Sequence, residues 1–420
     1  MSANVTLTPS VYAKLTLMDL GGSLKVAKNM STEVTSEFGK KDYKIGDTVS
    51  VFKPYRFVGG SSIVFTPEPL ADQKLTISVK QIAAVHFLME SVERTLNIRE
   101  AMKLYTKPTA LAMGAKINSA AATYAANNAL NSVGTPGTPP ATEATYLAAG
   151  DVLVELGLPD DEELTLIINR RMSTAFVSGT KTLLNPAGAI SSQWNKGVMA
   201  DSLGYKVQRD QTINGRTNGT YSGTPLVNGA AQTAAGGNNA TQTLNTDGWG
   251  SGITSLKVGD RFTIGSASSA TIGGVESVHP QTRVTTGRQQ VFTVTANIAD
   301  AAGVVNAVVR PAITATGQYQ NVNSTPVDNA IITMIGTSGL TGITQGLLLH
   351  ANAFAFVNVP LAAPLPNGVE AVESETDPET GLSIRYIRYF DGDNSQHKHR
   401  FDSLFDFGNL YPEMAAVIQS

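Results

Sequence analysis

The chain has 420 residues and no cysteine, and its 31 Lys and Arg residues nearly balance its 34 Asp and Glu residues. The absence of cysteine excludes disulfide scaffolds, thiolate metal sites and cysteine nucleophiles, and the slightly acidic balance argues against nucleic-acid binding through bulk positive charge. Only 15% of the residues are charged, against about 25% in ordinary soluble domains. Because interface cores are depleted in charge, this deficit suits a chain whose surface is partly covered by copies of itself.

The N-terminal residues lack the basic and continuously apolar regions of a signal peptide. The most apolar long stretch, 346–366, contains a histidine, two asparagines and prolines. Unpaired polar groups are costly in hydrocarbon, so this stretch is interpreted as buried strand and not as a membrane span. We therefore expect a soluble protein that is made and kept in the cytoplasm of its producer.

The first elements predicted are a short helix and a long hairpin. Thr8-Pro9, followed by apolar residues at helical spacing, predicts a helix that ends at Gly21-Gly22. Two strand-like runs, 48–57 and 75–80, flank a segment rich in Gly, Ser and Pro, which indicates a hairpin with a broad tip. An isolated hairpin is marginal in water, so this one should lie against something else.

A helical and then a mixed pattern follows. From Ala83 the sequence turns helical, and after Pro108 the run 109–130 predicts a helix of roughly 23 residues, about 35 Å long. Residues 141–213 are typical of mixed α/β structure, with a buried strand at 164–169 that leads into another helix.

The composition changes sharply after residue 213. The stretch 214–252 holds 9 glycines in 39 residues and only two charged residues, Arg216 and Asp247. Short runs rich in Val, Thr and Ile continue to about residue 335 and suggest a small β-barrel or sandwich. Because the α/β pattern then resumes, this region is interpreted as an inserted β domain whose two ends lie close together.

The C-terminal part predicts two strands, 382–390 and 399–407, joined by a turn at 391–394, and a last strand at 415–418. The turn resembles the start of a calcium loop but lacks the required glycine and glutamate, so a plain hairpin turn is favoured. His397 and His399 share one face of the second strand and could offer two metal ligands, or could belong to an exposed polar face.

Motifs for catalysis and cofactor binding are incomplete. The segment 336–340 fails the last position of a nucleophile elbow, and 179–182 lacks the earlier glycine of a phosphate loop. The glycines at 248–252 open no predicted helix, as a dinucleotide fingerprint would require. We expect no catalytic residue, no cofactor and no metal.

Basic residues are the candidates for subunit interfaces, namely Lys53, Arg56, Lys74, Lys80, Arg170, Arg171, Arg385 and Arg388. Those on the hairpin could present positive charge to a neighbour, or could serve only as solubilising charges on its edge. The arginines could bind an anion, or could form salt bridges within or between subunits.

The order of these elements resembles tailed-bacteriophage major capsid (coat) proteins. The segment 44–49 leading into 52–57 looks like the first strand of their E-loop. Segments 256–264 and 319–323 look like the insertion domain of the coat proteins of short-tailed Salmonella phages, and 405–418 is similar to their C-terminus. The resemblance covers nearly the whole chain in order.

The resemblance implies an α+β chain with the Hong Kong 97-type capsid fold and an inserted β-barrel-like domain. The segments it implies are an N-arm at 1–40, an E-loop hairpin at 41–82, a peripheral domain with a spine helix at 83–140 and 382–420, an axial domain at 141–213 and 337–381, and the inserted β domain at 214–336.

It also implies a structural, non-enzymatic function. The chain would assemble into pentamers and hexamers that form an icosahedral shell around double-stranded phage DNA, which it would contact weakly and non-specifically. A scaffolding protein and a portal would be partners, and the virion capsid, assembled in the bacterial cytoplasm, would be its location. The alternatives are a tail tube or fibre subunit, which predicts more uniform β structure, and a cytoplasmic hydrolase, which needs converging titratable groups.

Two features depart from the resembled family or extend it. The stretch 230–239 carries no charge, whereas the corresponding loop of the relatives carries charges that bridge capsomers. A shorter loop or an apolar contact is expected instead. Some relatives of this fold cross-link through a hairpin lysine, for which Lys53 or Lys74 would be the counterpart, although no acidic motif supports the reaction.

Overall fold

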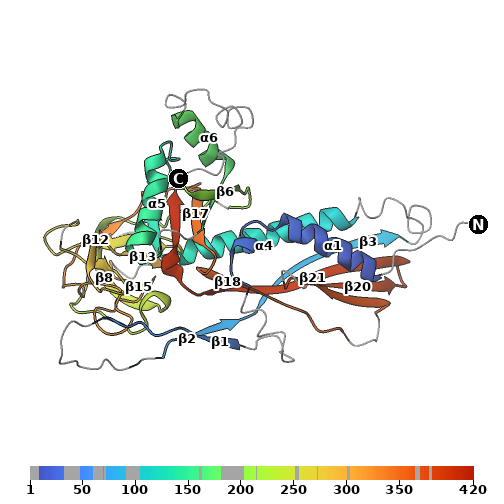
Figure 1. Ribbon diagram of the computed structural model, residues 1–420. Coiled ribbons are helices and arrows are strands. Elements are labelled where there is room, and N and C mark those ends of the chain that lie inside the picture. Colours follow the sequence, from blue (N-terminus) through green and yellow to red (C-terminus); the bar gives the residue numbers. More distant parts are fainter. Residues whose placement is uncertain are drawn as a thin grey trace, which may run out of the picture. The chain divides into compact units, whose positions relative to one another are not determined.

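A computed structural model of the chain (Figure 1) describes residues 9–32, 48–59, 70, 72–90, 105–159, 163–180, 203–213, 215–250, 255–271, 273–299, 303–364, 369–377 and 381–420. Parts of the predicted arm and hairpin, including 1–8, 33–47 and 60–69, lie outside the described residues. The chain divides into two compact units. One comprises Met1–Val51, Thr76–Ala121 and Ala355–Gly408, and the other comprises Phe52–Leu75, Ala122–Phe354 and Asn409–Ser420.

The first unit is built on a sheet centred on β21, which pairs with β3, β18 and β20, while β20 also pairs with β19. Their bounds are β3 Gln81–Glu90, β18 Phe354–Val359, β19 Ala371–Thr376, β20 Ser383–Asp391 and β21 Gln396–Asn409. The β20–β21 hairpin closes at Asp391, which faces Gln396. The predicted C-terminal hairpin is therefore confirmed.

Helix α1, Pro9–Ser23, packs on β19 and β20 (Figure 1). The predicted helix is confirmed, but the apolar stripe that predicted it, Val11, Leu15 and Met18, is not the buried one, since Met18 is 75% exposed. The buried residues are Ala13, Leu17 and Leu20, which also recur at helical spacing. The ring of Tyr12 stacks on that of Tyr386 with centroids 5.9 Å apart. The helix continues through the two predicted stop glycines to Ser23, so this glycine pair does not end it.

Helix α4, Lys107–Asn128, is the predicted long helix and has 22 residues. Within the first unit, Ala110, Met113, Ile117 and Ala121 form a fully buried stripe at i, i+3 and i+4 spacing. The small residues on this stripe allow its neighbours to approach closely.

The helical pattern predicted from Ala83 is wrong for its first residues, because Gln81–Glu90 is strand β3 and pairs with β21 over ten residues. Ala83 faces inward and is buried, whereas Ile82 and Leu88 point outward and are 43% and 56% exposed. Because the outward positions are also apolar, the period of two that marks a half-buried strand is hidden in the sequence.

The second unit contains a sheet of order β4-β22-β17-β5-β6, in which β5–β6 and β22–β4 are parallel pairs. The bounds are β4 Asn131–Val133, β5 Leu164–Ile168, β6 Tyr205–Arg209, β17 Gln345–His350 and β22 Ala415–Gln419. Helix α5, Glu143–Glu155, packs on β22 and β4, and Asn169 caps helix α6, Arg170–Thr180, by accepting the Met172 N–H at 2.8 Å. Every residue of β5 and β17 is buried, as expected for central strands.

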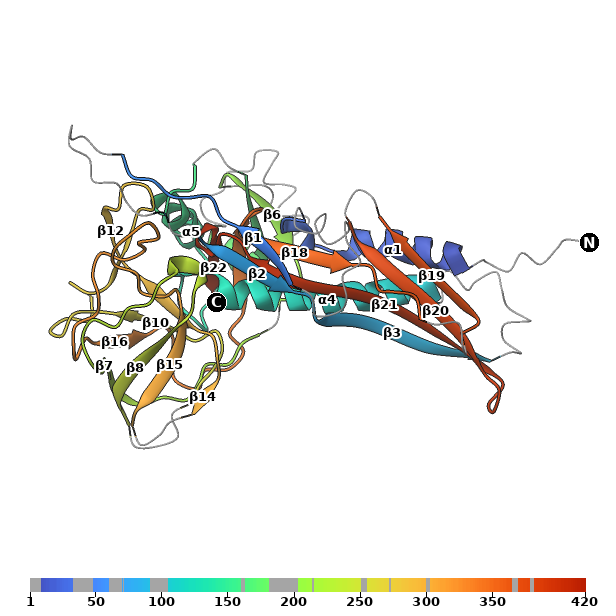
Figure 2. The ribbon, with the colours of Figure 1, turned by 90° about the horizontal axis from the view of Figure 1, so that it is seen from below.

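A six-stranded sheet of order β16-β10-β13-β15-β8-β7 forms the other core of this unit (Figure 2). The bounds are β7 Gly223–Val227, β8 Gln242–Trp249, β10 Arg261–Ile264, β13 Val291–Val294, β15 Val305–Arg310 and β16 Ile332–Met334. Its two edge strands approach each other, since Val227 donates to the Ala330 carbonyl at 2.9 Å, so the sheet is a nearly closed barrel. Arg216 and Ile343 exchange backbone hydrogen bonds of 2.8 and 2.9 Å, which confirms that the two ends of this region lie together.

The predicted long hairpin begins as the two-stranded sheet of β1, Thr48–Phe52, and β2, Lys74–Ser78. The remaining elements are short: the pairs β9 Ser255–Leu256 with β14 Ile298–Ala299 and β11 Glu276–Val278 with β12 Thr285–Gln289, and the 3-10 turns η1 Ala27–Asn29, η3 Gly237–Asn239 and η4 Pro412–Met414. Within the described residues, no helix is both long and apolar enough to cross a membrane.

Candidate assembly surfaces

Two of the basic candidates, Lys53 and Arg56, meet on the C-terminal segment of the chain. The Arg56 guanidinium pairs with the Glu413 carboxylate in turn η4, whose side chain is only 3% exposed. The Lys53 ammonium lies over the Tyr411 ring, 4.5 Å from its centroid. The hairpin base is thus fixed by one buried ion pair and one cation–π contact.

The surroundings of Lys53 lower the pKa of its ammonium group. Burial lowers the pKa of the Lys53 ammonium to about 8, because the charged form loses hydration. The Glu413 carboxylate offsets part of this effect, and the Arg56 charge adds to it. Lys53 therefore loses its charge not far above neutral pH.

The charge-free stretch 230–239 contacts the same region through polar groups. The Gly236 carbonyl accepts a hydrogen bond of 2.5 Å from the Gln73 amide, and the Asn239 amide donates to the carbonyl of Asn409 at 3.2 Å. Within the described chain, these contacts tie the stretch to the hairpin base and the C-terminal segment.

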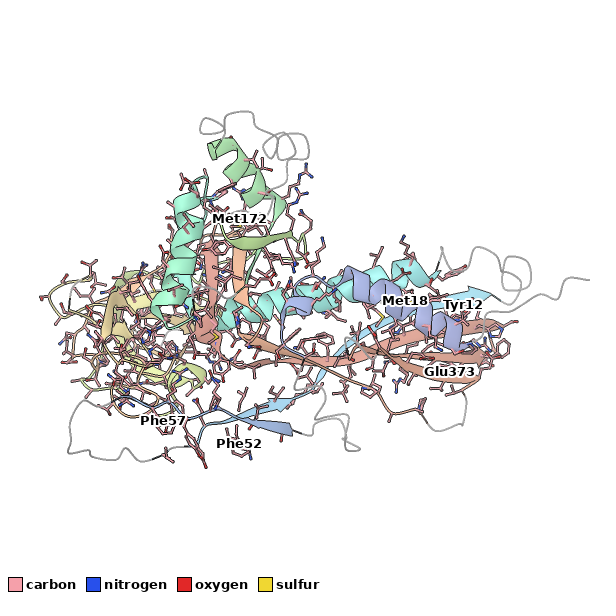
Figure 3. The ribbon with its side chains drawn as sticks, in the orientation of Figure 1. Tyr12, Met18, Phe52, Phe57, Met172 and Glu373 are labelled. Atoms are coloured by element: carbon pink, nitrogen blue, oxygen red, sulfur yellow. The ribbon has the colours of Figure 1, made fainter. Side chains whose placement is uncertain are left out.

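Large apolar side chains surround the hairpin contact and stay exposed. Phe52 and Phe57, both labelled in Figure 3, are 66% and 69% exposed, and Leu70 is 62% exposed. The Lys74 ammonium lies 5.8 Å from the Phe52 centroid. Exposed aromatics beside a cation are typical of protein–protein contact surfaces.

The other candidates are distributed differently. The Arg385 guanidinium binds the fully buried Asp402 carboxylate at 2.8 Å, and Arg388 binds Glu370 at 2.7 Å, so both form salt bridges within the subunit. The Lys80 side chain is exposed, and its backbone N–H donates to Asp406 at 3.0 Å. Arg170 and Arg171 are exposed and lie in the first turn of α6. The interface role of all eight residues stays a prediction.

The two histidines of β21 do not form the exposed polar face that was one expectation, since His397 and His399 are 8% and 4% exposed. The His399 ring stacks on Phe87 with centroids 4.9 Å apart, and its Nδ1 lies 2.7 Å from the Tyr386 hydroxyl. In the part of the chain that the structure describes, no three His, Asp or Glu side chains gather closely enough to hold a metal ion.

The turn between β20 and β21 is a plain hairpin turn, as predicted. The Asp391 carboxylate accepts a hydrogen bond from the Asp393 N–H at 3.2 Å and pairs with the Lys398 ammonium at 2.7 Å. Hydrogen bonds from Lys398 and Asn394 lower the pKa of Asp391 to about 2. Its oxygens are thus satisfied by neighbours on the turn itself.

The sequence did not predict the residues that contact the hairpin base, chiefly Glu413, which pairs with Arg56, and Tyr411, which lies under Lys53. Arg56 and Glu413 are 357 positions apart, and neither lies in a spacing pattern that would link them. The available signal was a charged residue inside an apolar C-terminal segment, which indicates a buried partner without saying which one.

Comparison with protein families identifies the family of this chain. A family model described as "P22 coat protein - gene protein 5" matches residues 19–419. The chain belongs to the P22 coat protein family. This coat protein is a major capsid protein that forms a phage shell, and the predicted mixed α+β capsid fold with a barrel-like sheet is confirmed.

Solved phage structures resemble the coat protein at low identity. A Mycobacterium phage Che8 structure is 11% identical, covers 94% of this chain and 90% of its own, and has a TM-score of 0.47. The mature capsid of bacteriophage PhiM1 is 7% identical, covers 90% and 83%, and has a TM-score of 0.43. The capsid structure of cyanophage P-SCSP1u is 10% identical, covers 90% and 83%, and has a TM-score of 0.39. No curated protein sequence matches the chain.

Proposed function

We propose that this coat protein assembles into pentamers and hexamers that build an icosahedral shell around double-stranded phage DNA, without catalytic activity. The observation that carries the proposal is the family match over residues 19–419. One chain can close such rings when a heterologous interface rotates back on itself. The low charge content, 15% of residues, is consistent with surfaces that become buried on assembly.

The reaching elements in this proposal are the N-arm, residues 1–40, and the E-loop hairpin, residues 41–82. Exposed apolar side chains on both favour contact with a neighbour: Met18 on α1 is 75% exposed and Phe57 on the hairpin is 69% exposed. Segments 83–140 and 382–420 would form the peripheral domain, 141–213 and 337–381 the axial domain, and 214–336 the insertion.

A scaffolding protein and a portal would be the assembly partners, and assembly would take place in the bacterial cytoplasm before the protein resides in the virion. The net charge of -3 predicts only weak and non-specific contact with packaged DNA. The eight basic candidates would act at subunit contacts or stabilise the elements that make them.

Negative-stain electron microscopy of the expressed protein, alone and with a candidate scaffolding protein, tests the proposal. Rings, sheets or closed shells are expected, whereas straight tubes or fibres would favour a tail component. A species that stays monomeric and turns over a small substrate would overturn the coat assignment. Met18→Ser, at an exposed apolar position of α1 in the proposed N-arm, should impair the formation of correct shells and leave the subunit folded, as judged by circular dichroism.

A further inference from the structure

A pocket of about 340 Å³ opens in the second unit between the last turns of α4, the segment that enters the barrel, and the turn before β10. Its lining residues include Ala126 and Asn127 of α4, Arg216 and Thr217 of the entering segment, and Lys257 and Asn297 of the barrel.

The walls of the pocket carry more positive than negative charge. Arg216 and Lys257 line it, and the guanidinium of the fully buried Arg261, which does not line it, donates to the carbonyl of the lining residue Ala126 in α4. The carboxylate that faces these three cations is that of Asp260, 3.4 Å from the Arg216 guanidinium. Three cations therefore share one carboxylate.

That carboxylate is already engaged by the backbone. One oxygen of Asp260 accepts hydrogen bonds from the N–H groups of Lys257 and Gly219 at 2.8 and 3.0 Å. In the described chain, Nε and Nη1 of both Arg216 and Arg261 have no hydrogen-bond partner, and the Arg216 side chain is only 10% exposed. A buried guanidinium left in this state is costly, and an anion in the pocket beside Arg216 would offset the cost.

We propose that this pocket binds a small oxyanion of the phosphate type. Arg216 and Lys257 would supply the charge, and the Thr217 hydroxyl and the Asn127 amide would supply neutral donors. The bound anion would join the end of α4 to both the entering segment and the turn before β10.

The test is isothermal titration of the full-length protein with inorganic phosphate, at fixed pH and with chloride at matched ionic strength as the reference. Saturable binding with one site per chain is expected, together with a phosphate-dependent rise in the thermal unfolding midpoint. A matched titration with a nucleoside monophosphate separates free phosphate from a phosphate group carried on a larger molecule. Absence of saturable binding of either ligand would overturn the proposal.

Asn297→Asp is the most informative variant. The Asn297 oxygen accepts the Val258 N–H at 2.9 Å, and an aspartate keeps that acceptor while adding a negative charge at the pocket. Phosphate affinity should fall by about tenfold or more through repulsion. Lys257→Gln, at an exposed lysine, should weaken binding in the same direction.

Lys206→Gln is the control, because Lys206 is an exposed lysine of the same unit that pairs with Glu163 at 3.5 Å and does not line the pocket. Its phosphate affinity should equal that of the wild type. Unchanged affinity in both Asn297→Asp and Lys257→Gln would place any phosphate elsewhere and refute the site. Unfolding midpoints in chloride alone establish that each variant is folded.

Discussion

The side-chain oxygen of Asn118, in the middle of α4, accepts hydrogen bonds from the backbone N–H groups of Val26 at 3.2 Å and Lys25 at 3.1 Å. The amide group of the same side chain donates to the Ser23 carbonyl at 2.9 Å. Asn118 is 2% exposed, so one buried amide satisfies the backbone where α1 ends and the next turn begins. This residue anchors the arm to the long helix.

Replacement of Asn118 by Ala should destabilise the subunit by about 1–3 kcal/mol, because the backbone groups of residues 23–26 would lose a buried partner. The measurement is urea unfolding of the monomer at a single pH. Lys116→Ala, at an exposed position on the same helix, serves as the control and should change stability by less than about 0.5 kcal/mol. Equal effects of the two changes would mean that Asn118 has no anchoring role.

Gly114 permits the close approach of α4 to the end of α1. A Cβ at position 114 would lie 2.0 Å from the Ser23 hydroxyl oxygen and 3.0 Å from its Cβ. Gly114→Ala should therefore destabilise the protein by about 1–3 kcal/mol, although alanine is the better helix former. In a double-mutant cycle, Ser23→Gly should recover much of the loss, and strictly additive effects would contradict the steric account.

Glu413→Gln removes the charge that Arg56 faces while keeping the shape of the side chain. Because the Arg56 side chain is 24% exposed and Glu413 is 3% exposed, Arg56 would keep a partly buried charge without its counter-ion, and the free energy of unfolding should fall by about 1–3 kcal/mol. Thermal unfolding measures the loss. The paired variant Lys206→Gln breaks an exposed ion pair and should cost less than about 1 kcal/mol.

The pKa of Lys53 predicts a pH dependence with a defined sign. With the folded pKa lowered from 10.5 to about 8, the unfolded chain binds more protons between these values, so the contribution of Lys53 to stability rises with pH in this window. The rise should stay below about 3 kcal/mol. Chemical unfolding between about pH 8 and pH 10 measures it, and Lys53→Met should flatten the curve. If the free energy of unfolding of the wild type fell relative to that of Lys53→Met over this pH range, the lowered pKa of Lys53 would be contradicted.

Phe57→Ser tests the hairpin surface. Because Phe57 is 69% exposed, monomer stability should change by less than about 0.5 kcal/mol, while assembly monitored by light scattering should slow or fail if a neighbour covers this ring. Val284→Ser, at a site that is 62% exposed and outside the proposed reaching elements, is the matched control. Normal shell yield from Phe57→Ser would remove this side chain from the proposed interface.

Local patterns predicted much of the secondary structure. Helical spacing in α1 and α4, the continuous apolar run of β5, and the Asp-Gly turn before β21 each indicated the element that forms. Strand β3 was misread because Ile82 and Leu88, on its outer face, are as apolar as its buried positions. Periodicity reports burial only where the two faces of an element differ in polarity.

The sequence by itself excluded thiol chemistry and marked the inserted β region by the shift in composition after residue 213. The low charge only permitted a shell subunit, and the resemblance of the ordered elements to phage coat proteins supplied that class. The tertiary structure alone decided which charges meet. Arg56 pairs with Glu413, which is 357 positions away in the sequence. The neutral Asn118 side chain likewise accepts a hydrogen bond from the backbone of Val26, 92 positions away. Such pairs leave no periodic trace, because hydrogen bonds and ion pairs depend on distance in space, whereas hydrophobic spacing is repeated along the chain.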